Sequence, residues 1–168
     1  MEGRLKLRAV DEEDLRTLAA VLQDALVQVS DIEFLAGENR FVLVANRFRW
    51  EVCADGPARS ETGAPAPSSS EAASGEEGRY ERVLTGLVFD QVSAVRIREI
   101  DRRRRSRILE VLTIEPGAGT ITLVLAGGAA IRLEVERISC WLEDLSEPWP
   151  TSWRPGHDPA GPSPQKDR

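Results

Sequence analysis

Four consecutive arginines, Arg102, Arg103, Arg104 and Arg105, are the most conspicuous charged feature of the sequence. Guanidinium groups bind phosphates and carboxylates, so this run could contact a nucleic-acid backbone or an acidic protein partner, and salt would weaken either contact. No aromatic residue interleaves with the arginines, so single-stranded bases would find no platform for stacking. Strand-like runs flank the segment on both sides. We therefore expect a hairpin tip, where plain solvation is the ordinary role of such charges and nucleic-acid binding is disfavoured.

Residues 46–51, NRFRWE, offer a second candidate anion site. In a strand, Phe48 and Trp50 would point to one face, while Arg47 and Arg49 would point to the other. Two guanidiniums on alternate residues can present a fork to a carboxylate or phosphate. The alternative is a purely structural role, in which the strand is half-buried and its arginines pair with acidic residues on neighbouring strands. We expect the sheet face that carries Arg47 and Arg49 to be the contact surface of the protein.

A third candidate lies near the C-terminus, in the stretch PWPTSWRPGHD. His157 next to Asp158 invites a general-base interpretation, but a base needs a nucleophile or a substrate pocket held beside it. This pair lies in a proline-rich segment instead. The tryptophans are expected to pin the segment over an apolar groove or the open end of a sheet. Trp153, Arg154 and His157 of this segment would then lie at the border of the contact surface.

The rest of the sequence carries no motif of catalysis or of cofactor binding. Walker-type phosphate loops, HExxH zinc motifs and GxSxG nucleophile elbows are all absent. The two cysteines, Cys53 and Cys140, lie far apart, and the single histidine leaves a structural zinc site without ligands. We therefore expect no metal and no cofactor, and we lean towards a protein that is not an enzyme.

Charge and composition limit the classes of partner. The chain has 168 residues and a net charge of −6, and its sequence pI is about 5.0. A dedicated nucleic-acid binder or a protein that docks on anionic membranes would carry the opposite sign. The N-terminal residues lack the apolar region of a signal peptide, and no apolar run has the length of a membrane span. A cytoplasmic location is expected.

The length favours a single domain, which we expect over residues 1–145. It should be interrupted by a disordered loop at residues 54–79, because this stretch is rich in Ala, Gly, Pro and Ser and contains no large apolar residue. Residues 146–168 hold six prolines and should form an extended tail.

The remaining pattern predicts an α+β fold. Asp11 is a good helix N-cap, and apolar residues then recur at helical spacing: Leu15, Leu18, Ala19, Leu22, Ala25 and Leu26. Alternating runs with turn residues between them follow from residue 31 onwards. They predict an antiparallel sheet of about seven or eight strands, curled into an open barrel or packed over the N-terminal helix. The stretch SCWLEDL is expected to form a short C-terminal helical segment.

Several stretches together resemble a bacterial family known as domain of unknown function 2948: LKLRAVDEEDL, LQDA, NRFRWE, GLVFDQV, GGAAIRLEVE, LEDL and PWPTSWRPGHD. The resemblance spans roughly residues 4–53 and 81–158, and residues 54–79 look like an insertion in this member. It implies an intracellular bacterial protein, and it supplies no activity and no catalytic residue.

The sequence thus favours a non-enzymatic binding or interaction module, with an acidic protein as a candidate partner. Two alternatives remain open: a protein associated with RNA or other nucleic acid through Arg102–Arg105, and an enzyme that uses His157. The oligomeric state is left open.

Overall fold

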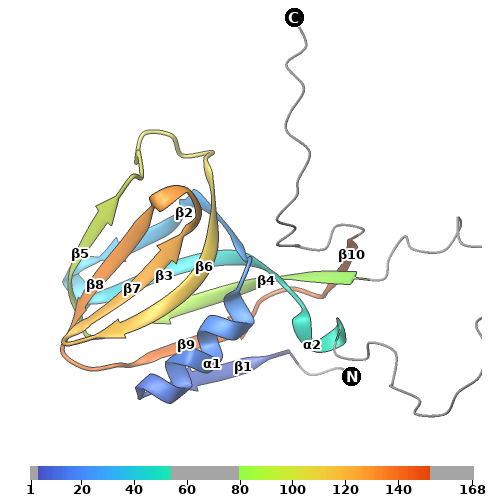
Figure 1. Cartoon of the computed structure of the whole chain (residues 1–168), viewed down its shortest axis with the longest axis horizontal. Coiled ribbons are helices and arrows are strands. Elements are labelled where there is room, and N and C mark those ends of the chain that lie inside the picture. Colours follow the sequence, from blue (N-terminus) through green and yellow to red (C-terminus); the bar gives the residue numbers. More distant parts are fainter. Residues whose placement is uncertain (1–3, 54–79, 152–168) are drawn as a thin grey trace, which may run out of the picture.

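The computed structural model describes residues 4–53 and 80–151 (Figure 1). Its elements confirm the predicted α+β class, with one N-terminal helix and a large antiparallel sheet. Along the chain the elements are β1 (Lys6–Ala9), α1 (Glu12–Leu22), β2 (Leu26–Leu35), η1 (Ala36–Glu38), β3 (Arg40–Phe48), α2 (Trp50–Cys53), β4 (Tyr80–Phe89), β5 (Val92–Arg98), β6 (Ile108–Gly117), β7 (Thr120–Leu125), η2 (Ala126–Gly128), β8 (Ala130–Val135), β9 (Cys140–Asp144) and β10 (Trp149–Thr151).

The ten strands of the described residues belong to one sheet. Nine of them follow the order β1-β9-β4-β3-β2-β6-β7-β8-β5, and β10 pairs with β4 outside this path. The strands at the two ends, β1 and β5, do not pair with one another. The sheet is neither closed nor strongly curled. Of the two arrangements that we expected, the open barrel does not form, and the sheet packs on the N-terminal helix. Helix α1 packs on β6 and β1, so it covers apolar surface that barrel closure would otherwise have to bury.

Helix α1 begins where the sequence predicts. The Asp11 carboxylate accepts a hydrogen bond from the Asp14 amide (2.9 Å), and the Asp14 carboxylate accepts one from the Val10 amide (3.0 Å). The first bond satisfies an amide of the first helical turn, which lacks a partner within the helix, and the second ties the residue before the N-cap to that turn. The helix ends at Leu22, earlier than the predicted face implies. Asp24 has a φ of 61°, which turns the chain, and Leu26 begins strand β2.

The core forms between α1 and the sheet. Leu15, Leu18 and Leu22 are all buried, as their spacing predicts. They belong to one hydrophobic cluster that also contains buried side chains of β2, β3, β4, β6, β7, β8 and β9. This cluster connects the helix with these strands of the sheet.

The predicted C-terminal helical segment is wrong. The residues of SCWLEDL form strand β9, which lies between β1 and β4. Cys140, Leu142 and Asp144 are buried, while Trp141 and Glu143 between them are half-buried, a period of two that is typical of a strand. Further along, β10 pairs with β4 within the segment assigned to the tail. These two strands bring the number above the seven or eight that we expected.

The glycine-rich turns are confirmed as hairpin connections. Gly127 and Gly128 adopt φ values of 76° and 75° between β7 and β8, a conformation that side chains with a Cβ rarely take. The predicted pairing of β5 with β6 is wrong, however, because β5 pairs with β8. The edge of β6 that faces away from β7 is occupied by residues 26–28 of β2, so β5 takes the edge of β8 instead.

Candidate functional site

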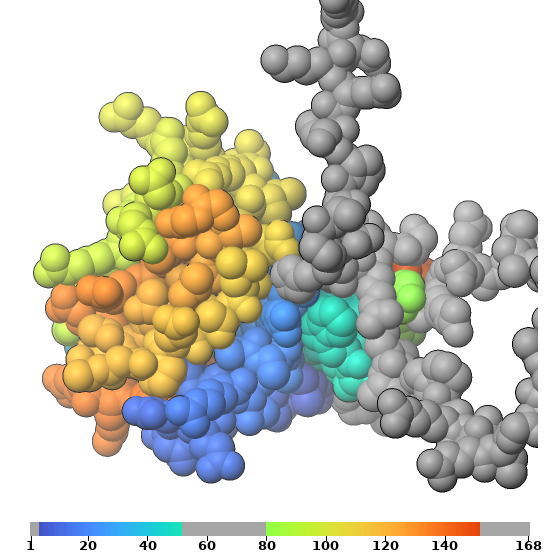
Figure 2. All heavy atoms as spheres, in the orientation of Figure 1, coloured from blue at the N-terminus to red at the C-terminus, as the bar shows by residue number. Residues whose placement is uncertain are grey.

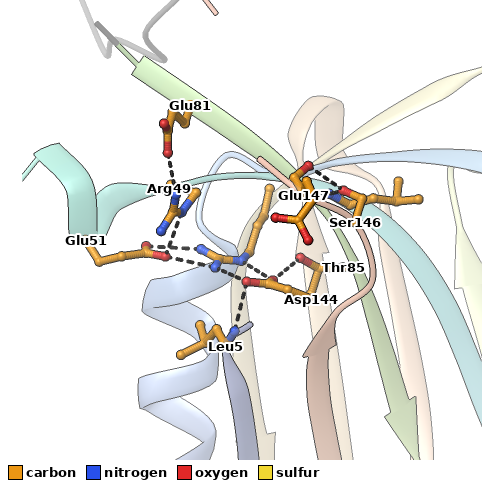
Figure 3. Close-up of polar contacts among 10 residues, drawn as sticks. Leu5, Arg49, Glu51, Glu81, Thr85, Asp144, Ser146 and Glu147 are labelled. Atoms are coloured by element: carbon orange, nitrogen blue, oxygen red, sulfur yellow. Dashed lines mark hydrogen bonds and ion pairs between the residues drawn. The ribbon is translucent and has the colours of Figure 1, made fainter. Parts of the chain in front are cut away.

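The first predicted contact residue, Arg47, lies inside the protein. Its side chain is 0% exposed, and its guanidinium engages the carboxylates of Glu51 and Asp144, both of which are labelled in Figure 3. Nε and Nη2 donate to the Asp144 oxygens at 2.9 and 2.7 Å. Nη1 and Nη2 donate to the Glu51 oxygens at 3.1 and 2.9 Å. Because its donors are occupied and no part of it reaches solvent, Arg47 is not available to a partner in this structure.

The Asp144 carboxylate accepts hydrogen bonds from two further groups. The Thr85 hydroxyl donates to its Oδ1 at 2.7 Å, and the Leu5 amide donates to its Oδ2 at 3.3 Å. These bonds link Asp144 of β9 to β4 and to the residue before β1, and the bonds from Arg47 link it to β3. We call Arg47, Glu51, Thr85 and Asp144 the buried ion network, in which Arg47, Thr85 and Asp144 are buried and Glu51 lies at the surface. Buried charges are tolerated when they are paired and hydrogen-bonded in this manner.

The ion network shifts the pKa of its members. Burial alone would raise the pKa of Asp144 above its ordinary 3.8, but hydrogen bonds from Arg47 and Thr85 outweigh burial and lower it. The pKa of Glu51 is likewise lowered from 4.5, because hydrogen bonds from Arg47 outweigh its partial burial. Burial would lower the pKa of Arg47, yet the bonds to Asp144 and Glu51 raise it. All three groups therefore stay charged at neutral pH.

These shifts predict loss of stability in acid. A carboxyl group whose pKa is lower in the folded state stabilises the protein fully above its unfolded pKa, and the contribution disappears as the pH falls through the folded pKa. Stability should hold from neutral pH down to about 4.5 and then decline, as the unfolded values of 4.5 and 3.8 are passed. Thermal unfolding measured between about pH 3 and 7 checks this. The Asp144→Asn variant should decline less steeply, and an equal decline would contradict the assignment.

Arg49 and Trp50 also make their contacts within the protein. Arg49 forms an ion pair with Glu81 and lies 3.5 Å from Glu51. The Trp50 indole donates to the Gln23 carbonyl at 3.0 Å, and its ring packs against Phe48 with centroids 4.6 Å apart. The arginines of NRFRWE thus pair with acidic side chains of the same chain, which was the alternative interpretation of this stretch. The stretch joins α2 to the sheet.

A second buried arginine lies beside this joint. Arg82 of β4 is paired with Phe48 across the sheet, and its guanidinium lies 5.7 Å from the centre of that ring. It donates to the Asn46 carbonyl at 3.1 Å. Burial lowers the pKa of Arg82, while the nearby charges of Asp24 and Glu110 act in the opposite direction. This end of β3 is thus held by charged groups that are internal to the fold.

The Arg102–Arg105 run lies on an exposed connection, which we call the arginine loop (residues 99–107). It leads from the end of β5 across the sheet to β6 and is not the tip of a hairpin between paired strands. Its backbone is fixed to β2, because the Val29 and Ser30 amides donate to the Arg107 and Arg105 carbonyls, both at 2.9 Å. The Arg103 amide donates to the Asp101 carboxylate at 2.9 Å. The four arginine side chains remain exposed on this fixed backbone.

The outer face of the sheet beside this loop carries three more arginines. Arg96 and Arg98 are on β5, and Arg132 is on β8 directly opposite Arg96. Arg96 Nε lies 3.1 Å from Glu134, and Arg98 Nε donates to the Gly128 carbonyl at 3.2 Å. Within the described part of the chain, the Arg132 side chain makes no hydrogen bond or ion pair. Figure 2 shows residues of β5, the loop and β8 side by side at the surface.

These arginines surround a small open hollow. It has a volume of about 250 Å³ and is lined by Arg96, Ile97, Arg98, Thr122, Ala130 and Arg132. Three guanidiniums and one hydroxyl thus border a space that no carboxylate lines. A larger neighbouring hollow of about 600 Å³ shares Arg96 and Arg132 but is also lined by Glu134 and Glu136. We call Arg96, Arg98 and Arg132 together with Arg102–Arg105 the basic face.

Repulsion within the basic face predicts a stabilising substitution. Like charges directly opposite one another on neighbouring strands destabilise a sheet. Arg132→Gln should therefore raise the melting temperature by about 2 °C at low salt. The increase should vanish at about 1 M salt, where screening removes the repulsion. Arg8→Gln, which removes an exposed arginine from β1, should leave the melting temperature unchanged, and an equal rise there would refute the explanation.

Sequence reasoning did not bring Arg96, Arg98 and Arg132 together as one site. The alternation of β8 does show that Arg132 points outward. It does not show that β5 becomes its neighbour, because that pairing depends on the tertiary structure. The other predicted site residues, Trp153, Arg154 and His157, lie outside the described residues, as does the loop at 54–79.

The described residues contain no group of three or more His, Cys, Asp or Glu side chains that could hold a metal ion. No helix among the described residues has the length and apolar character needed to cross a membrane. Cys140 is buried, and this burial raises the pKa of its thiol to about 12. The thiol therefore stays protonated at neutral pH and is a poor nucleophile.

Comparison with known proteins places the chain in a family without assigning an activity to it. No curated protein and no solved structure matches the sequence. A family model does match, over residues 5–157, which is nearly the whole chain. The resemblance seen in the sequence is thereby confirmed. The chain belongs to the family described as protein of unknown function (DUF2948).

Proposed function

We propose that this protein is a non-enzymatic binding module that receives an anionic partner on its basic face. The observation that carries the proposal is the hollow between Arg96, Arg98 and Arg132, which no carboxylate lines. An arginine that forms a surface ion pair has its charge neutralised by an acidic side chain. Here the Arg132 side chain forms no ion pair among the described residues, and it stands directly opposite another arginine.

The contrast with the buried ion network supports the choice of this face. Arg47 and Arg49 are matched by acidic side chains from their own chain, so their charge is satisfied within the fold. The arginines of the basic face are exposed and largely unmatched. Exposed guanidiniums gathered on one surface attract carboxylates and phosphates, and they can bind them through two parallel hydrogen bonds.

The charge of the whole chain supports a local contact. The net charge is −6. The basic face carries seven arginines, so the rest of the chain is strongly acidic. A long polyanion would be repelled wherever it left the basic face, whereas a short acidic segment would fit within it. An acidic partner is therefore favoured over a long nucleic acid.

The proposal is tested by fluorescence anisotropy with a labelled poly-glutamate peptide. The triple variant Arg96→Gln, Arg98→Gln, Arg132→Gln should bind at least about tenfold more weakly than the wild type. Its control is the variant Lys6→Gln, Arg8→Gln, Arg16→Gln, which removes the same charge from exposed positions on β1 and α1. The control should change affinity less than about twofold, and binding by the wild type should weaken when salt rises from about 50 to 200 mM.

Two outcomes would overturn the proposal. If the wild type does not bind poly-glutamate even at low salt, the basic face is a solvated surface. If the two triple variants lose affinity equally, only the net charge matters and no particular face receives the ligand.

A further inference from the structure

We infer that the partner is an acidic peptide segment that binds in an extended conformation, as an added strand along the free edge of β5. The inference rests on the proposed function, and it names both the class of partner and the way it binds. Peptide addition to an exposed strand edge is a common mode of recognition, in which backbone hydrogen bonds provide affinity and side chains provide specificity.

The first step is that β5 has an unpaired edge. It is the last strand of the sheet path and pairs only with β8. At its start, the Val92 amide donates to the Asn39 carbonyl at 2.8 Å. Beyond that point, residues 94–98 make no backbone hydrogen bond on the side away from β8 within the described structure. In an antiparallel strand, alternate residues direct their N–H and C=O groups to each side, so this edge offers free donors and acceptors.

The second step is the pattern of side chains along that edge. Arg96 and Arg98 point to the outer face, towards Arg132 and the hollow. Ile97 lies between them on the opposite face and is 42% exposed, and Val95 on the same side is half-buried against the core. An added strand would lie about 4.8 Å from β5, so its side chains would face these residues in turn. The matching segment alternates carboxylates with apolar residues.

The third step is that the arginine loop continues the positively charged surface for an acidic peptide beyond the end of β5. Arg98 ends β5, and Arg102–Arg105 follow within a few residues on the fixed backbone of the loop. A peptide that continues past the end of β5 would reach these exposed guanidiniums. Further acidic residues at that end of the segment should therefore add affinity, with a strong dependence on salt.

The same charges argue against two other occupants. A second copy of this chain, pairing through β5, would set Arg96 and Arg98 against the same arginines of the first copy, and like charges on opposed strands repel. A nucleic acid lacks a peptide backbone that could complete the strand edge. No aromatic side chain lines either hollow, so bases would have no stacking platform there.

The test uses a short peptide that alternates Glu and Val and is about as long as β5. A second peptide has the same sequence with alternate backbone amides methylated, which keeps its charge and side chains but removes the donors that an added strand needs. A third probe is single-stranded RNA of equal charge. The full-length protein should bind the first peptide at least about tenfold more tightly than the other two. Backbone amides in residues 94–98 should then exchange with solvent more slowly than in the free protein.

Two variants locate the contact. Arg96→Gln, Arg98→Gln should weaken binding of the alternating peptide about tenfold or more, whereas the control Arg8→Gln, Arg16→Gln should change it less than about twofold. Residues 26–28 of β2, which pair with β6, should show no change in amide exchange on binding.

The outcomes separate this inference from the proposed function. Equal binding of the plain and methylated peptides, with unchanged exchange at residues 94–98, would refute strand addition while leaving the basic face as the binding surface. Tighter binding of RNA would refute the acidic peptide as partner but keep an anionic one. If none of the three probes binds, both the inference and the proposed function are refuted.

Discussion

Replacing Asp144 with asparagine should lower the free energy of unfolding by about 3 to 5 kcal/mol, the range seen when one member of a buried ion pair is removed. Asparagine keeps the size of the side chain but not its charge, and its amide nitrogen cannot accept a hydrogen bond from Arg47 Nη2. The guanidinium of Arg47 would then remain buried with Glu51 as its only ionised partner, and the Glu51 side chain is 44% exposed. Urea denaturation followed by circular dichroism measures the loss.

Two further variants identify the cause of that loss. Arg47→Lys keeps the positive charge but cannot form the two-pronged bonds to Asp144 and Glu51, so it should also destabilise the protein, by a smaller amount. The double variant Arg47→Met, Asp144→Leu should lose less stability than the sum of the two single changes, because it removes both charges together. If Asp144→Asn loses less than about 1 kcal/mol, the ion network does not hold these strands together.

Replacing Leu18 with alanine should cost about 2 to 5 kcal/mol of stability, the range for deleting a buried leucine side chain. Leu18 is 1% exposed and lies in the core between α1 and the sheet. Its loss would leave a cavity at the main contact of the helix, which packs chiefly on β6. Thermal or urea unfolding measures the change.

A matched control is available on β6 itself. Leu112 is 37% exposed and points away from the core, so Leu112→Ala should cost less than about 1 kcal/mol. An equal loss from the two substitutions would mean that the helix does not cover the core as described. Neither substitution touches the basic face, so both variants should keep the affinity of the wild type for poly-glutamate as long as they remain folded.

Local features of the fold could be read from the sequence because the interactions behind them are local. Asp11 caps α1 through an amide three residues away, and Leu15, Leu18 and Leu22 share a face through the helical repeat itself. The hairpins at the glycine-rich turns are local in the same sense. The helical assignment of residues 139–145 failed because a short segment with apolar residues is ambiguous until its neighbours are known. Pairing with β1 and β4 decides that it is a strand.

The candidate site was harder to predict because its residues come together through distant pairings. Arg96 and Arg132 are separated by most of two hairpins in sequence, and only the pairing of β5 with β8 sets them opposite one another. The opposite error concerns Arg47. We expected it on an exposed strand face, but it is buried. Asp144 lies 97 residues further along the chain, and no sequence spacing reveals that it will neutralise this arginine inside the protein.

The amino-acid sequence by itself determined the α+β class, the capped amphipathic helix, the alternation that makes each strand two-sided, and the membership of a family without known activity. Only the tertiary structure decided which arginines are internal and which remain at the surface. The physical reason is that burial and charge neutralisation depend on contacts between strands far apart in the chain. Those contacts are chosen by the packing of the whole sheet, and local periodicity does not specify them.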